Sequence, residues 1–159
     1  MTLLERPHDI NPQRIITLLR ERGEEIFGGR GIVAAYLYGS VATGGFHPYS
    51  DVDIALVLDE ETFADLTPYQ RLHFELDMEI RIETLTGIDY TEVRVINDAP
   101  LKFRGQVACE GIRIYCGDEG RRAEFEIKTW KEYFDYTPYL QMMRQAFWER
   151  LNERMRQRA

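Results

Sequence analysis

Asp51 and Asp53 are the residues whose type and spacing most clearly suit chemistry. On a predicted strand both side chains project to the same face, because successive side chains alternate between the two faces. Two carboxylates on one face repel each other unless a cation neutralises them, and a hard divalent ion such as Mg²⁺ prefers oxygen ligands. The sequence therefore predicts a metal site at this pair of aspartates.

A second polar feature, Gly39-Ser40, follows the apolar run that precedes the aspartates. Backbone amides of a glycine-rich turn, together with the Ser40 hydroxyl, can bind an anion, and more strongly if a helix begins there. A phosphate-binding turn beside metal-binding carboxylates predicts a nucleoside triphosphate substrate and attack on a phosphorus atom.

The elements that must position these residues follow from apolar runs and their boundaries. Short apolar runs between glycines or polar turns predict strands at residues 32–38, 52–58, 91–96 and 112–115. Helical spacing and caps predict helices at residues 10–27, 101–110 and from 119 onward, the last broken near 135–138. These elements predict an α/β (α+β) fold with a small mixed sheet of about four strands flanked by helices.

Residues 68–86 fit two descriptions. Their apolar residues alternate as in a strand, but the segment is long, rich in Glu, Leu and Met, and bounded by Thr67-Pro68 and Gly87. We predict a helix with apolar side chains on more than one face, which the sheet and a second neighbour would cover.

The composition and charge of the chain exclude several classes of protein. The chain has 159 residues and a net charge of −7. Residues 1–120 hold 11 basic and 21 acidic side chains, whereas residues 121–159 hold 9 basic and 6 acidic ones. The acidic balance argues against direct nucleic-acid binding, and no apolar run approaches the ~18 residues of a membrane span. Residues 1–12 lack the apolar stretch of a signal peptide. With Cys109 and Cys116 expected as buried reduced thiols, we predict a cytoplasmic protein without disulfides.

The spacing Gly39-Ser40-x9-Ser50-Asp51-x-Asp53 resembles the signature of nucleotidyltransferases with a DNA polymerase β-like palm. The small size and the stretches at 92–100, 111–115 and 133–136 are similar to minimal nucleotidyltransferases (MNT). Members of that group are commonly antitoxins paired with a helical HEPN ribonuclease toxin. The resemblance implies transfer of AMP from ATP to a tyrosine hydroxyl of that toxin, which silences it.

The resemblance also implies roles for individual residues. Gly39, Ser40 and Ser50 would bind the nucleotide, and Asp51 and Asp53 would be catalytic ligands of Mg²⁺ in a two-ion site. Glu92 occupies the place of the third carboxylate, where the family most often has Asp, and would ligate the second ion and help deprotonate the attacking hydroxyl; Asp89 is the alternative. Thr43 stands where many relatives carry a basic residue, and Arg94 is the candidate to replace that charge. We expect a nucleotidyltransferase domain over residues 1–118 and a helical extension over residues 119–159.

Other interpretations stay open. Glu92 could instead form an ordinary surface ion pair with Arg94. The departures from the family pattern at Glu92 and Thr43 also keep open an antitoxin that blocks its toxin by binding alone. A small-molecule (antibiotic) nucleotidyltransferase is a third possibility, although residues 116–159 are short for a substrate domain. The basic tail and the helix at 68–86 either pack on their own domain or dock a partner protein.

Overall fold

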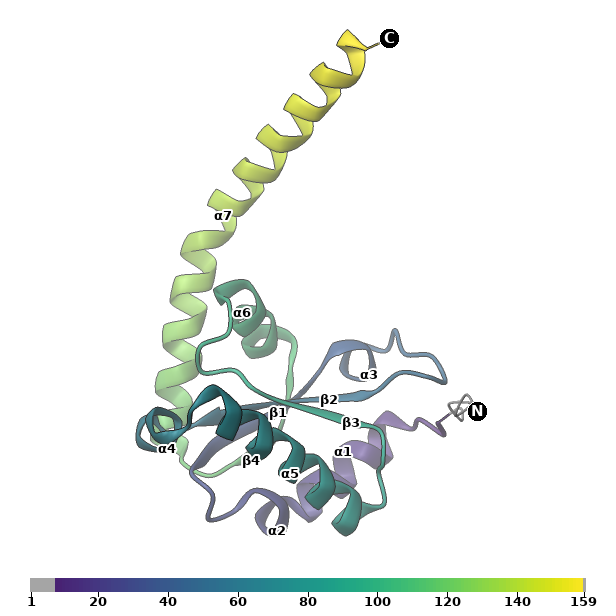
Figure 1. Ribbon diagram of the computed structural model, residues 1–159, viewed down its shortest axis with the longest axis vertical. Coiled ribbons are helices and arrows are strands. Elements are labelled where there is room, and N and C mark those ends of the chain that lie inside the picture. Colours follow the sequence, from purple (N-terminus) through teal and green to yellow (C-terminus); the bar gives the residue numbers. More distant parts are fainter. Residues whose placement is uncertain (1–7, 159) are drawn as a thin grey trace.

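The computed structural model describes residues 8–158, and the first seven residues, where we expect no signal peptide, lie outside it. Its centre is a four-stranded sheet of order β3-β2-β1-β4 (Figure 1). The strands are β1 (Ile32–Tyr38), β2 (Val52–Leu58), β3 (Thr91–Val95) and β4 (Ile112–Cys116). β1 runs antiparallel to β2 and β4, whereas β2 and β3 are parallel. The mixed sheet confirms the predicted fold class.

Helices cover both faces of this sheet (Figure 1). One face packs against α1 (Pro12–Glu21), α2 (Gly23–Phe27) and α5 (Pro68–Thr86), and the other against α6 (Leu101–Glu110) and the start of α7 (Glu119–Gln157). Two short helices, α3 (Gly39–Thr43) and α4 (Glu60–Asp65), follow β1 and β2. None of the helices within residues 8–158 combines the length and the apolar character that a membrane crossing requires.

The segment at 68–86 is a helix, as predicted, because its ends are fixed locally. The Thr67 hydroxyl accepts from the Gln70 amide while the Gln70 side chain accepts from the Thr67 amide, and Gly87 ends the helix in the left-handed conformation. Met78 and Ile82 are buried against the sheet. Leu72, Leu76 and Ile80 are exposed, so the predicted cover of a second face is not provided by residues 8–158.

Two helix predictions were wrong in detail. The helix predicted at 10–27 is two helices, α1 and α2, separated at Arg22. The break predicted near 135–138 is absent, because α7 continues through Pro138 as one helix of 39 residues that bends part-way along (Figure 1). Pro138 has no amide to donate to the preceding turn. Next to it, the Thr137 hydroxyl donates to the Tyr133 carbonyl at 2.7 Å.

The cysteines depart from their predicted burial. Cys109 and Cys116 are both free, as expected, but Cys109 is exposed and Cys116 is only partly covered. The short helix α6 and the edge strand β4 that carry them present these positions near the surface.

A buried polar network fixes α7 to the sheet. The Tyr36 hydroxyl of β1 donates to Glu126 Oε1 at 2.6 Å, and Arg122 Nη1 donates to Glu126 Oε2 at 2.6 Å. Glu126 is buried, and burial, together with the hydrogen bond to Glu126, raises the pKa of Tyr36 well above its usual value. The network therefore anchors the first part of α7 to β1 through the buried Glu126 carboxyl group.

Removal of the Tyr36 hydroxyl should destabilise the protein. In Tyr36→Phe the buried Glu126 loses one of its two partners, which should lower the free energy of unfolding by about 2 kcal/mol. Urea denaturation measures this change. Tyr139→Phe removes the same hydroxyl at an exposed site and should change stability by less than about 0.5 kcal/mol. Equal effects from the two variants would contradict the role of the network.

Candidate active site

A row of side chains crosses three neighbouring strands at the end of β1. Tyr38 of β1 is the register partner of Asp53 of β2, and Asp53 is the register partner of Glu92 of β3. Register partners point to the same face of a sheet from strands about 4.8 Å apart. Tyr38 packs edge-on against Phe103 of α6, with ring centroids 5.2 Å apart. The row therefore lies on the face of the sheet that α6 covers.

Asp53 is held in an unfavourable electrostatic environment. Partial burial, then the negative charges of Glu92 and Asp51, raise the pKa of Asp53 to about 6, while Arg94 opposes them. Tyr38 is affected in turn, because burial and the charge of Asp53 raise the pKa of its hydroxyl to about 12. The carboxylates are thus near enough to interact, and a cation beside them would relieve their repulsion.

Gly39 brings the backbone directly against Asp53. The residue adopts φ +74°, and a Cβ built there would collide with Asp53 Oδ2 and lie 3.3 Å from its Cγ. Only glycine adopts this conformation readily and leaves the carboxylate in place. The close approach places the Gly39-Ser40 turn, at the start of α3, next to Asp53, one of the predicted metal ligands.

Ser50 and Thr43 are used within the turn itself. Ser50 is buried, and its hydroxyl accepts from the His47 amide at 2.9 Å, which closes the loop before Asp51. The Thr43 hydroxyl donates to the Gly39 carbonyl at 3.2 Å. His47 accepts from the Tyr49 amide through Nδ1 at 3.2 Å, a contact within the same loop. These contacts shape the connection between the Gly39-Ser40 turn and the aspartates.

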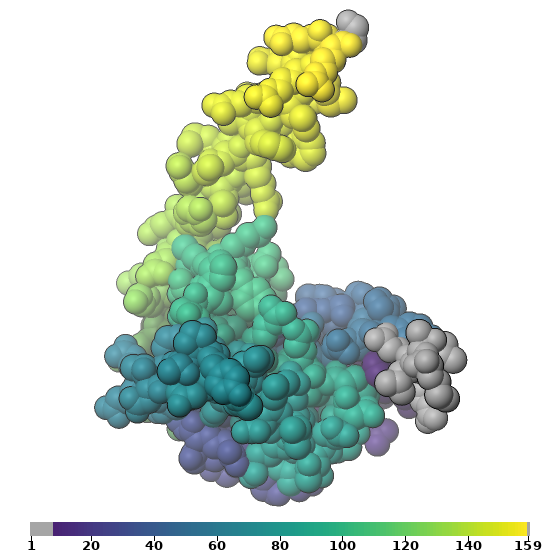
Figure 2. All heavy atoms as spheres, in the orientation of Figure 1, coloured from purple at the N-terminus to yellow at the C-terminus, as the bar shows by residue number. Residues whose placement is uncertain are grey.

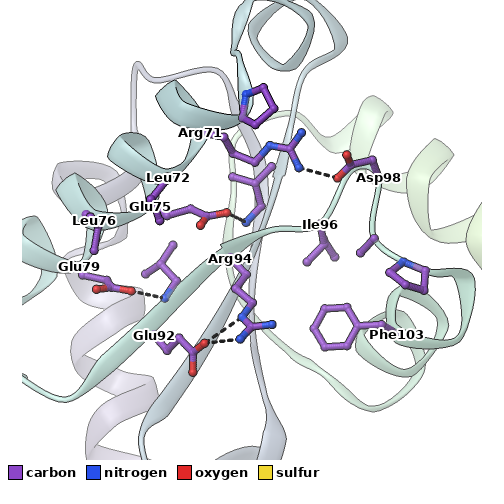
Figure 3. Close-up of a pocket in the computed structure, with 15 residues that line it drawn as sticks. Arg71, Leu72, Glu75, Leu76, Glu79, Glu92, Arg94, Ile96, Asp98 and Phe103 are labelled. Atoms are coloured by element: carbon purple, nitrogen blue, oxygen red, sulfur yellow. Dashed lines mark hydrogen bonds and ion pairs between the residues drawn. The ribbon is translucent and has the colours of Figure 1, made fainter.

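Glu92 is paired with a cation of its own strand. Arg94 donates to Glu92 Oε1 from Nε at 2.9 Å and from Nη2 at 2.6 Å (Figure 3). Within residues 8–158 no three acidic, histidine or cysteine side chains are grouped so that they could hold a metal ion. Asp51, Asp53 and Glu92 therefore do not form a preassembled three-ligand site. Asp89, the alternative third carboxylate, is exposed and lies in the loop before β3.

A groove of about 750 Å³ begins at Glu92 and follows β3 between α5 and α6. It includes Arg94 and Phe103 but not Asp51 or Asp53 (Figure 3). On its α5 side, Glu79 Oε1 accepts from the Val93 amide at 2.9 Å and Glu75 Oε1 accepts from the Val95 amide at 3.0 Å. These carboxylates satisfy amides at the edge of the sheet. Their pattern in the sequence is that of an ordinary solvated helix face, so sequence reasoning missed them.

The effect of pH on stability should report the environment of Asp53. Its pKa is about 6 in the folded protein and near 3.8 ordinarily, so the folded protein binds this proton more tightly than the unfolded chain. The contribution of Asp53 to the free energy of unfolding therefore decreases as pH rises from about 4 to about 6. Because the side chain is half-buried, Asp53→Asn should stabilise the metal-free protein by only about 1 kcal/mol at pH 7, and by almost nothing at pH 4.

Urea denaturation in EDTA at the two pH values measures this difference, with Asp59→Asn as the control. The Thr62 amide donates to Asp59 and lowers the pKa of that carboxyl, so Asp59→Asn should not stabilise the protein at pH 7. If Asp53→Asn raised the free energy of unfolding equally at pH 4 and pH 7, the raised pKa of Asp53 would be contradicted.

Comparison with known proteins decides the family. Residues 21–120 match the sequence profile of the family described as Polymerase beta, Nucleotidyltransferase. The chain belongs to this nucleotidyltransferase family. The matched segment contains Gly39, Asp51, Asp53 and Glu92. No curated protein sequence matches the chain significantly.

Solved structures share the nucleotidyltransferase fold. One chain of a toxin–antitoxin crystal structure with AMP-PNP superposes with a TM-score of 0.54 and 22% identity, over 89% of this chain and 98% of that chain. One chain of a structure of tri-AMPylated Shewanella oneidensis HEPN toxin in complex with MNT antitoxin gives a TM-score of 0.56 and 17% identity, over 86% and 98%. At these identities the likeness establishes the fold alone.

Proposed function

We propose that this nucleotidyltransferase is an antitoxin of the MNT type, which transfers AMP from ATP to a tyrosine hydroxyl of a HEPN-family toxin in the cytoplasm. The observation that carries the proposal is the alignment of Asp53 with Glu92 across β2 and β3, with the Gly39 backbone pressed against Asp53. The tri-AMPylated HEPN toxin in a similar complex supports the choice of substrate, and the complex with AMP-PNP supports ATP. The two free cysteines fit a reducing compartment.

The residues at the end of β1 would bind the nucleotide. The amides of the first turn of α3 and the Ser40 hydroxyl would offer hydrogen-bond donors to an anion, which suits a triphosphate. Ser50 would contribute by holding the loop that leads from this turn to Asp51. The backbone of Gly39 keeps the phosphates close to Asp53, because no side chain separates them.

Asp51, Asp53 and Glu92 would hold Mg²⁺. The donor set fits, since the ligands are carboxylates and the mutual repulsion that raises the pKa of Asp53 is relieved by a cation. When bound, Mg²⁺ supplies the positive charge that stabilises the transferring phosphoryl group and the pyrophosphate. The ion pair with Arg94 uses Glu92 Oε1, which leaves Oε2 of the same carboxylate for another partner.

The reaction forms one bond and breaks another at the α-phosphorus of ATP. The tyrosine oxygen bonds to this phosphorus, and the bond between the phosphorus and the bridging oxygen of pyrophosphate breaks. The hydroxyl proton would pass to a carboxylate of the row, and Glu92, on the edge strand β3, is our candidate acceptor. The protein forms no covalent intermediate, so catalysis depends on positioning and on charge.

Incubation of the chain with a purified HEPN toxin, ATP and Mg²⁺ tests the proposal. Mass spectrometry should show AMP added to a toxin tyrosine, and the addition should require Mg²⁺. Absence of added AMP with an active toxin would overturn the enzymatic proposal.

The Glu92–Arg94 ion pair favours a second candidate, an antitoxin that acts by binding alone. Thermal unfolding with ATP and Mg²⁺ separates the two candidates. If the folded enzyme alone binds ATP with Mg²⁺, its free energy of unfolding should rise by about 2.7 kcal/mol at a ligand concentration one hundred times the dissociation constant. A chain with a degenerate site should show no change in melting temperature.

A further inference from the structure

The second half of α7 (residues 139–157) packs against no other element within residues 8–158. It extends away from the α/β body as a single column of atoms (Figures 1 and 2). Large apolar side chains along this part of α7 are exposed: Tyr139, Met142, Met143, Phe147, Trp148 and Met155. Helices of this kind gain most of their stability from packing, and a contiguous exposed apolar surface marks an interaction site.

The apolar side chains of this half helix follow a regular row. Every fourth residue from Tyr139 to Met155 is apolar, which forms a ridge inclined to the helix axis. A parallel row next to it ends in arginines, Arg150, Arg154 and Arg158. Residues 139–158 hold five arginines and two glutamates, a net charge of +3. The partner of this ridge must therefore offer an apolar row beside negative charge.

Helix α5 has the complementary pattern. Leu72, Leu76 and Ile80 form an exposed apolar row with the same spacing of four. Glu75, Glu79 and Glu83 form the parallel row beside it. Glu75 and Glu79 are held in place, because each accepts a backbone hydrogen bond from β3 through Oε1. This helix is therefore a rigid apolar ridge with an acidic border.

We propose that the second half of α7 of one copy of this chain packs across α5 of a second copy. Ridges with a spacing of four pack into each other at a crossing angle of about −50°, the most frequent geometry between helices in globular proteins. The arginine row of α7 would then face the glutamate row of α5. Two α7 helices against each other would instead bring together two surfaces of charge +3, which electrostatics disfavours.

The contact must be made between copies. α7 starts on the face of the sheet opposite to α5 and continues as one helix away from the body (Figure 1). A twofold axis would let each α7 reach α5 of the other copy, so both contacts would form in a closed dimer. The proposal does not depend on catalytic activity.

Mixed cross-linking tests the contact directly. In a Cys109→Ser/Cys116→Ser background, one preparation carries Phe147→Cys in α7 and the other carries Leu76→Cys in α5. A short bismaleimide added to the mixture should give a heterodimer joined through these two positions. Glu149→Cys, on the opposite face of α7, is the matched control and should give at least tenfold less of it. Products that join only α7 to α7 would overturn the proposal.

Sedimentation measures the same contact without labels. The full chain should be a dimer, and Leu76→Asp or Phe147→Asp should each weaken dimerisation by about 30-fold, as expected for a central interface residue. Gln145→Glu adds a negative charge on the opposite face of α7 and should leave the dimer intact. Circular dichroism verifies that each variant is folded. The second copy would be contradicted as the partner if the chain stayed monomeric over a 100-fold increase in protein concentration. A contact of α7 with a HEPN toxin alone would contradict it too.

Discussion

Asp53→Asn should lower AMP transfer by about 10³-fold or more while leaving the protein folded. The substitution keeps the shape of the side chain but removes one of the negative charges that would hold Mg²⁺ beside the α-phosphate. Metal charge stabilises such a transition state by several kcal/mol, and each 1.36 kcal/mol is a factor of ten in rate. Single-turnover assays with saturating ATP measure the chemical step, and Asp51→Asn should show a loss of similar direction.

Asp59→Asn is the matched control for this prediction. Asp59 follows β2 at the opposite end from Asp53, where it caps α4 by accepting from the Thr62 amide at 2.7 Å. The same chemical change at this position should leave kcat within about twofold of the wild type. If Asp53→Asn retained a tenth of the wild-type rate with Mg²⁺ saturating, the assignment of Asp53 as a metal ligand would be wrong.

The sheet could be predicted from the sequence because its strands are coded locally. The runs at 32–38 and 52–58 are short and mostly apolar, and they end at glycine or at polar turns. Such a run would be unfavourable in a solvent-exposed element, so it indicates a buried strand. The path of the tail could not be predicted in the same way. A proline preceded by threonine is typical of a helix start. Pro138 instead lies inside α7, because the residues before and after it are both helical.

The candidate site could be predicted only in part. The face shared by Asp51 and Asp53 follows from strand alternation, whereas the contact between Asp53 and Glu92 depends on the parallel register of β2 and β3, which α4 and α5 separate in sequence. Spacing alone does not specify that register, so Glu92 was identified by resemblance. Its ion pair with Arg94, two positions along the same strand, is local and was among the alternatives.

Gly39→Ala should reduce AMP transfer by about 100-fold and also destabilise the fold. The φ of +74° costs a residue with a Cβ about 1–2 kcal/mol. The new methyl group would in addition collide with Asp53 Oδ2, so the carboxylate must move away from the turn that we propose binds the phosphates. A displacement of about 1 Å in a reacting geometry is sufficient for a loss of this size.

Gly44→Ala separates the two effects, because Gly44 has φ +88° and no atom within 4 Å of the position that its Cβ would take. It carries the backbone strain without the collision, so it should lower the melting temperature like Gly39→Ala but reduce the rate much less. A double substitution completes the test: in an Asp53→Ala background the collision is gone, and Gly39→Ala should then destabilise no more than Gly44→Ala. Equal losses of rate for Gly39→Ala and Gly44→Ala would show that the turn, rather than its contact with Asp53, determines activity.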